Sequence, residues 1–143
     1  MFLGEYYTTF TGHNRVILPK KFRQELGGKR GVVLSRGLEG CIWGFSLEEW
    51  QKEASKQLET PVTERSGRDL RRYLFSAAEE VRLDDQGRLV VPGNLREYAQ
   101  LKGGVVIIGA GDHFEIWEGK EWEKLLKGLT KKEKLDEFGK NAS

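Results

Sequence analysis

The sequence carries one pattern of residues twice, and this repeat constrains the fold more than any other feature. At an offset of 73 residues, Arg15 aligns with Arg88, Pro19 aligns with Pro92, and the apolar triplet at 32–34 aligns with the triplet at 105–107. After small insertions, Ile42-Trp43 matches Ile116-Trp117 and Trp50 matches Trp122. Chance does not readily supply an arginine, a proline and an apolar triplet at one fixed spacing. The sequence therefore predicts an internal duplication.

Each copy predicts the same series of elements: a strand, an Arg-containing turn, a second strand, a helix that begins at proline, then two strands and a helix. Proline suits the first position of a helix because that N–H has no partner within the helix. Ser46 and Glu49 have the spacing of a capping box and predict the start of another helix. The expected strands are 6–10, 16–18, 31–35 and 41–45 in the first copy, and 81–83, 89–91, 105–108 and 114–117 in the second.

Neither half is expected to stand alone. A half of this size has a thin core, and hairpins with such short strands are not stable in isolation. We therefore expect an α+β fold in which the two copies, interleaved or side by side, share one core and bring both Arg turns to one face. The expected divisions are a first repeat with its helix at 1–60, a helical linker at 61–78, a second repeat at 79–128 and a polar tail at 129–143. For the tail, a short helix and disorder both remain open.

The composition and residue pattern exclude several classes of protein. No apolar run approaches the roughly 18 residues that cross a bilayer, and the N-terminus lacks the pattern of a secretion signal, so a cytoplasmic protein without a membrane partner is expected. Cys41 is the lone cysteine and lies in an apolar run, which indicates a buried thiol. We find no catalytic constellation, metal-ligand cluster or phosphate-binding glycine loop, so no enzyme activity, cofactor, metal or small-molecule substrate is expected.

Positive charge concentrates in the first copy. Residues 13–30 contain six Lys or Arg and one Glu, whereas residues 84–102 contain three basic and three acidic residues. Such a basic cluster is often only a solvated face, but it also fits a surface that binds an anion. The first copy is therefore expected to contribute more to binding than the second.

The repeated arginine is the best candidate for a binding residue. Arg15 and Arg88 each precede a short apolar strand whose burial would hold the backbone in place, and a guanidinium group suits phosphates and the acceptor edge of guanine. The alternative is a structural Arg–Asp pair, since Asp84 could hold Arg88 by a bidentate salt bridge, whereas Thr11 leaves Arg15 without a local acid. The candidate DNA-binding residues are His13, Asn14, Arg15, Lys20, Lys21, Arg23, Gln86 and Arg88, with Thr11 and Asp84 orienting the turns; the three residues from Lys20 to Arg23 lie where a helix dipole favours phosphate.

Four segments, residues 1–6, 15–23, 36–41 and 83–92, resemble the MraZ family, and the similarity extends to about residue 126. The family is similar to AbrB-like swapped-hairpin proteins. The resemblance implies two tandem AbrB-like swapped-hairpin units that form a small β-barrel-like core with flanking helices. The family motif is Asp, three residues, then Arg in each half. Asp84 and Arg88 match it, whereas Thr11 and Asn14 replace the usual Asp and Gly of the first half.

The resemblance also implies a function. It indicates a sequence-specific, DNA-binding transcriptional regulator, and more specifically a repressor, of the bacterial division and cell-wall gene cluster. Such a protein would associate with the nucleoid and bind short direct repeats in promoter DNA as a ring-shaped homo-oligomer.

The alternative function is a protein-interaction module of the toxin–antidote type. Such antidotes have one hairpin unit and an acidic tail, whereas this chain has two units and a Lys-rich tail. The four tryptophans could line contacts between subunits, although at least two of them are expected in the core.

Overall fold

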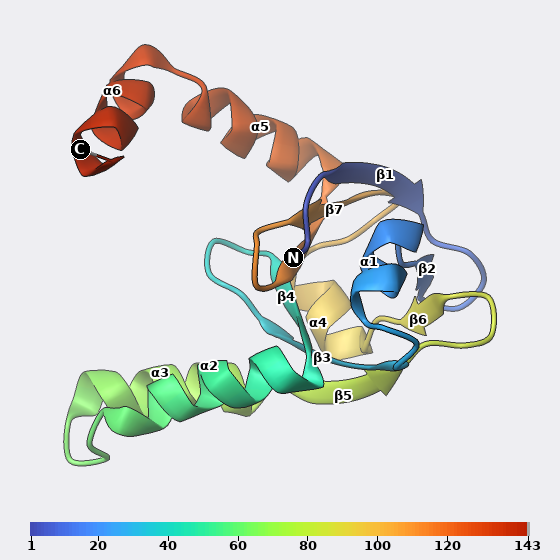
Figure 1. Cartoon of the computed structure of the whole chain (residues 1–143), viewed down its shortest axis with the longest axis horizontal. Coiled ribbons are helices and arrows are strands. Elements are labelled where there is room, and N and C mark those ends of the chain that lie inside the picture. Colours follow the sequence, from blue (N-terminus) through green and yellow to red (C-terminus); the bar gives the residue numbers. More distant parts are fainter. Residues whose placement is uncertain (143) are drawn as a thin grey trace.

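The computed structural model describes residues 1–142 (Figure 1). The first copy contains β1 (Glu5–Thr9), β2 (Arg15–Ile17), α1 (Lys20–Glu25), β3 (Gly31–Arg36), β4 (Ile42–Ser46) and α2 (Leu47–Glu59). The second copy contains β5 (Glu79–Arg82), β6 (Arg88–Val90), α4 (Gly93–Tyr98), β7 (Gly104–Gly109), β8 (Phe114–Glu118) and α5 (Gly119–Leu129). Helix α3 (Arg65–Phe75) connects the copies, and α6 (Lys132–Ala142) follows α5. The tail thus contains the helix α6, and Ser143 lies outside the described residues.

The two copies interleave. β1 of the first copy pairs antiparallel with β7 of the second, with Glu5 opposite Ile108. In return, β5 of the second copy pairs with β3 of the first, with Gly31 opposite Arg82. Each first strand therefore completes the sheet of the other copy, which decides between the interleaved and the side-by-side arrangements.

The large sheet is open, so the prediction of a β-barrel-like core is wrong. Its six strands run in the order β1-β7-β8-β4-β3-β5, and β2 and β6 form a separate two-stranded sheet, the β2–β6 ribbon. β1 does not pair with β2, and one isolated bridge, Thr11 to Arg15, joins the turn after β1 to the start of β2. Each ribbon strand is three residues long and is followed within two residues by Pro19 or Pro92, which has no N–H to continue a ladder. Strands this short do not extend far enough along the edges β1 and β5 to close a barrel.

One core lies between the sheet, the ribbon and the short helices α1 and α4. The ring of Phe22 in α1 lies 5.1 Å from that of Phe2 and 5.9 Å from that of Phe114, measured between centroids. Leu95 in α4 occupies the equivalent position of the second copy and is fully buried. The shared core explains why neither half needs a complete core of its own.

A smaller apolar cluster lies beneath α5. Trp117 and Trp122 are buried there together with Cys41, whereas Trp43 and Trp50 are half-buried. These positions confirm the expected burial of the thiol and of at least two tryptophans. Burial raises the pKa of Cys41 well above its usual range, so the thiol stays protonated.

Helices α2 and α3 form a hairpin, and α5 and α6 form a second arm (Figure 1). Both arms extend from the body on the side away from the ribbon (Figure 1). The Ser46 hydroxyl accepts a hydrogen bond from the Glu49 amide at 3.1 Å, which confirms the predicted start of α2. Within residues 1–142, no helix is long and apolar enough to cross a membrane.

Candidate nucleic-acid interface

The β2–β6 ribbon brings the two repeated arginines together. In its antiparallel register Arg15 lies opposite Val90, and Ile17 lies opposite Arg88. The central pair faces inward, since Val16 is 0% and Leu89 is 1% exposed. Because side chains alternate between the two faces of a strand, Arg15 and Arg88 both lie on the outward face, on a diagonal of about 7–8 Å between backbones.

In the second-copy turn, Asp84 organises the backbone and holds the arginine. Its Oδ1 atom accepts hydrogen bonds from the amides of Gln86 at 2.9 Å and Arg88 at 2.8 Å. Its Oδ2 atom accepts one from Arg88 Nε at 2.8 Å. These bonds, the one from the Arg88 amide foremost, hold the pKa of Asp84 below its ordinary value. The Asp84–Arg88 salt bridge that the sequence offered as a structural alternative is therefore present but not bidentate, because one carboxylate oxygen is occupied by backbone amides and a single guanidinium N–H uses the other.

The first-copy turn lacks the acid and shares two backbone features with the second, although Gly12 has a positive φ of 62° where the equivalent Asp85 does not. The Thr11 amide donates to the Arg15 carbonyl at 2.8 Å, as the Asp84 amide does to the Arg88 carbonyl. Asn14, with φ of 57°, takes the left-handed conformation that Gly87 takes at 78°. Arg15 is exposed, and its guanidinium has no hydrogen-bond or ion-pair partner among residues 1–142. Thr11 thus shapes this turn through its amide and does not hold the arginine.

One arginine in each short helix supports the turn of the opposite copy. Arg23 in α1 donates from Nε to the Leu18 carbonyl at 3.0 Å, and its Cδ lies 2.5 Å from the point where a Cβ on Gly87 would stand. Arg96 in α4 is the equivalent residue, and it donates to the Asn14 side chain. The sequence suggested Arg23 as a DNA contact and did not single out Arg96. The repeat offset, which relates the two residues, was the signal that could have paired them.

The remaining candidates surround the ribbon. His13 and Gln86 occupy equivalent, exposed positions in the two turns. Lys20 and Lys21 are exposed at the start of α1 and form no ion pair with any other residue that the structure describes. Since α1 spans only six residues, its dipole adds little, and the lysine ammonium groups supply the positive charge.

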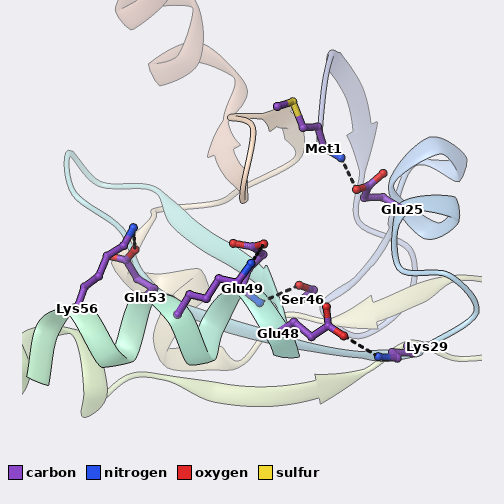
Figure 2. Close-up of polar contacts among 9 residues, drawn as sticks. Met1, Glu25, Lys29, Ser46, Glu48, Glu49, Glu53 and Lys56 are labelled. Atoms are coloured by element: carbon purple, nitrogen blue, oxygen red, sulfur yellow. Dashed lines mark hydrogen bonds and ion pairs between the residues drawn. The ribbon is translucent and has the colours of Figure 1, made fainter.

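Part of the positive charge in residues 13–30 is neutralised within the chain. Arg30 pairs with Asp85 at 2.5 Å. Lys29 pairs with Glu48 at 3.2 Å, as Figure 2 shows. Among the residues described, the charge without an ion-pair partner therefore lies on Arg15, Lys20, Lys21 and Arg23, next to the ribbon. This finding reduces the charge that the sequence assigns to the first copy but concentrates it at the candidate interface.

The groove beside α2 is a poor site for an anion. Its lining has four acidic residues, Glu25, Glu48, Glu49 and Asp112, which outnumber its two cationic groups, Lys29 and the N-terminus of Met1. Glu25 also pairs there with the N-terminal ammonium group of Met1 (Figure 2). Carboxylates at this density repel phosphate, so the groove does not compete with the ribbon as a candidate nucleic-acid site.

Comparison with known protein families identifies both copies of the repeat. The family model described as "MraZ protein, putative antitoxin-like" matches residues 1–73 and again residues 74–140, so both copies carry the family pattern at the offset seen in the sequence. Proteins named "Transcriptional regulator MraZ" are similar over most of their length. The protein from Halothermothrix orenii is 43% identical, over 85% of this chain and 84% of its own length. The protein from Acetivibrio thermocellus is also 43% identical, over 86% of this chain and 85% of its own length. The protein from Moorella thermoacetica is 41% identical, over 87% of this chain and 85% of its own length.

Proposed function

Because the chain belongs to the MraZ family of transcriptional regulators, we propose that it binds double-stranded promoter DNA with the β2–β6 ribbon in the major groove. It is a regulator and not an enzyme, as the sequence predicted. The observation that carries the proposal is the position of Arg15 and Arg88 on one outward face of a two-stranded ribbon. The major groove is wide enough to admit such a ribbon, and arginine is suited to the O6 and N7 acceptors of guanine.

The groups around the ribbon then have separate roles. Lys20 and Lys21 flank its first strand and contact phosphates, while His13, Asn14 and Gln86 lie in the turns at the ends of the ribbon strands. Arg96 holds the first-copy turn through its bond to Asn14, and Arg23 packs against Gly87 of the second-copy turn while it bonds the Leu18 carbonyl. Contacts from both turns set the register of the ribbon on the duplex, and the two ribbon arginines supply base recognition.

A single chain offers modest affinity. Arg15, Arg88, Lys20 and Lys21 are four cations at the interface, which corresponds to a slope of about −4 in a plot of log affinity against log salt. A ring of several chains on short direct repeats makes the later contacts intramolecular and raises the total affinity steeply. The family resemblance supports such a ring, acting as a cytoplasmic, nucleoid-associated repressor at the promoter of the division and cell-wall gene cluster.

The test is the double variant Arg15→Ala, Arg88→Ala, measured by fluorescence anisotropy on duplex DNA from upstream of the chain's own gene. We expect loss of specific binding with unchanged circular dichroism, because neither side chain lies in the core. The matched control is Arg65→Ala with Lys127→Ala, which removes two exposed charges from the arms. Wild-type affinity in the ribbon variant would overturn the assignment. Light scattering measures the molar mass of the protein in solution, and the mass of a monomer would overturn the proposed ring.

A further inference from the structure

Two aliphatic side chains lie exposed beside the ribbon arginines. Ile17 is 44% exposed and Val90 is 47% exposed, although both are large β-branched residues. They are equivalent positions of the two copies, since the repeat offset that relates Arg15 to Arg88 also relates Ile17 to Val90. The ribbon thus presents the same pair of side chains, one arginine and one aliphatic residue, from each copy.

The register arranges these four side chains as a rectangle on the outward face. Arg15 lies across from Val90, and Ile17 lies across from Arg88. Along each strand the arginine and the aliphatic residue are two positions apart, which is about 6.7 Å. Two base-pair steps of B-DNA cover about the same distance, since phosphates along one strand advance by about 3.4 Å each.

We propose that Ile17 and Val90 contact the C5 methyl groups of thymines next to the guanines read by the arginines, an inference that rests on the proposed function. The thymine methyl is the apolar group that a base pair exposes in the major groove, and aliphatic side chains recognise it by contact. The aliphatic pair therefore adds discrimination of thymine from cytosine to the preference for guanine.

The surroundings of the pair favour DNA over a second protein surface. Each aliphatic residue is bordered by an arginine along its strand and by another across the ribbon, and Lys20 and Lys21 follow β2 with only two residues between. A protein partner would have to bury these cations, at a large cost in desolvation. Strand preference alone does not explain the residues either, because the outward face of an exposed ribbon is ordinarily polar.

The experiment uses the full chain and labelled duplex from upstream of its own gene, in which each thymine of the bound repeat is replaced singly by deoxyuridine. This change removes the methyl group and keeps the hydrogen bonds of the base pair. We expect about a fourfold loss of affinity at a thymine contacted by Ile17 or Val90, the effect of one buried methyl group. The Ile17→Ala variant should bind more weakly and lose its sensitivity at one thymine, and Val90→Ala should do so at another.

The controls separate this proposal from the function on which it rests. Val62→Ala removes an aliphatic side chain that is 59% exposed, from the loop after α2, and should keep wild-type affinity and sensitivity to deoxyuridine. If wild-type chain binds the duplex but no thymine is sensitive, the methyl contacts are refuted and the proposed function stands. If it binds no promoter DNA, both fail. A change in oligomer size in Ile17→Ala with unaltered deoxyuridine sensitivity would make the pair a subunit contact and would also refute the proposal.

Discussion

Arg96 donates a hydrogen bond to the side chain of Asn14, a residue 82 positions earlier in the chain, and so holds the turn of the other copy. Its Nε also donates to the Leu101 carbonyl at 3.2 Å, and its guanidinium lies 3.9 Å from the centre of the Phe10 ring. The position of Arg15 in the ribbon therefore depends on a helix of the second copy. A side chain outside the proposed DNA-binding face can thereby control one that lies on it.

We predict that Arg96→Met lowers DNA affinity and reduces the free energy of unfolding by about 2 kcal/mol, the effect of losing a charged hydrogen-bonded group. The salt slope should stay unchanged, because Arg96 neutralises no phosphate. Arg96→Lys should fail to restore affinity, since a lysine cannot bond Asn14 and two carbonyls in one plane. A salt slope reduced by about one unit would instead identify a direct phosphate contact.

Arg15→Ala should weaken DNA binding more than Arg88→Ala. Arg15 has no partner in the rest of the described chain and lies beside Lys20 and Lys21, whereas Arg88 already pairs with Asp84 at 2.8 Å. Anisotropy titrations of the two single variants at several salt concentrations measure the difference. The reverse order of affinities would contradict the unequal contribution of the two copies.

Gly87→Ala should destabilise the protein more than Gly12→Ala. Both glycines have positive φ, 78° and 62°, and alanine in that region costs about 1–2 kcal/mol. At Gly87 the added methyl would also meet the Arg23 side chain, whereas at Gly12 it would meet open space. Chemical denaturation of both variants separates backbone strain from the clash. In an Arg23→Ala background the losses of stability caused by Gly87→Ala and Gly12→Ala should be closer to each other. An unchanged difference between them would show that the clash with Arg23 is not its cause.

Thermal stability should fall as the pH rises from 6 to 8. His113 lies between β7 and β8, stacks on Phe45 at 5.4 Å, and bonds Asp112 at 2.8 Å and Glu115 at 2.9 Å. Burial opposes its protonation, but the bonds to Glu115 and Asp112 outweigh burial and raise the pKa of His113 above its ordinary value of 6.5. The stabilisation is full below the unfolded pKa and is lost as pH rises through the folded pKa.

Calorimetric Tm values at successive pH steps test this dependence in wild type and in His113→Gln. The variant keeps a polar side chain but cannot titrate, so its Tm should vary less across this range. The pKa values of Asp112 and Glu115 are lowered, so these carboxylates affect stability only under more acidic conditions, where their stabilisation is lost. An equal slope in both proteins between pH 6 and 8 would exclude His113 as the cause.

Local features of the fold were predictable from residues near one another in the sequence. Pro19 and Pro92 precede helices, Ser46 caps α2, and the strands lie close to their expected places. The exchange of first strands was left open, because a pattern of apolar residues shows which face of a strand is buried and not which strand pairs with it. The open sheet was missed for the same reason. The divisions expected at residues 60, 78 and 128 remain a proposal.

The candidate site was predictable in its main residues and not in its supporting ones. The repeat indicated Arg15 and Arg88, but Arg23 looked like a surface cation because its bond to the Leu18 carbonyl forms only in the folded protein. Likewise, the charge of Arg30, counted in the basic cluster of the sequence, is neutralised by an ion pair with Asp85 of the other copy. Such pairs join residues far apart in the chain, so counts of charge along the sequence overestimate the free charge.

The exchange of strands between copies also sets the order in which the chain can fold. β1 is among the first segments to leave the ribosome, yet its partner β7 is made only when most of the chain is complete. A nascent chain that ends at residue 73 would carry a strand with no neighbour and a core lacking Leu89, Leu95 and Phe114. We therefore expect that synthesis yields no stably folded first half, and that an interrupted product is open to proteolysis.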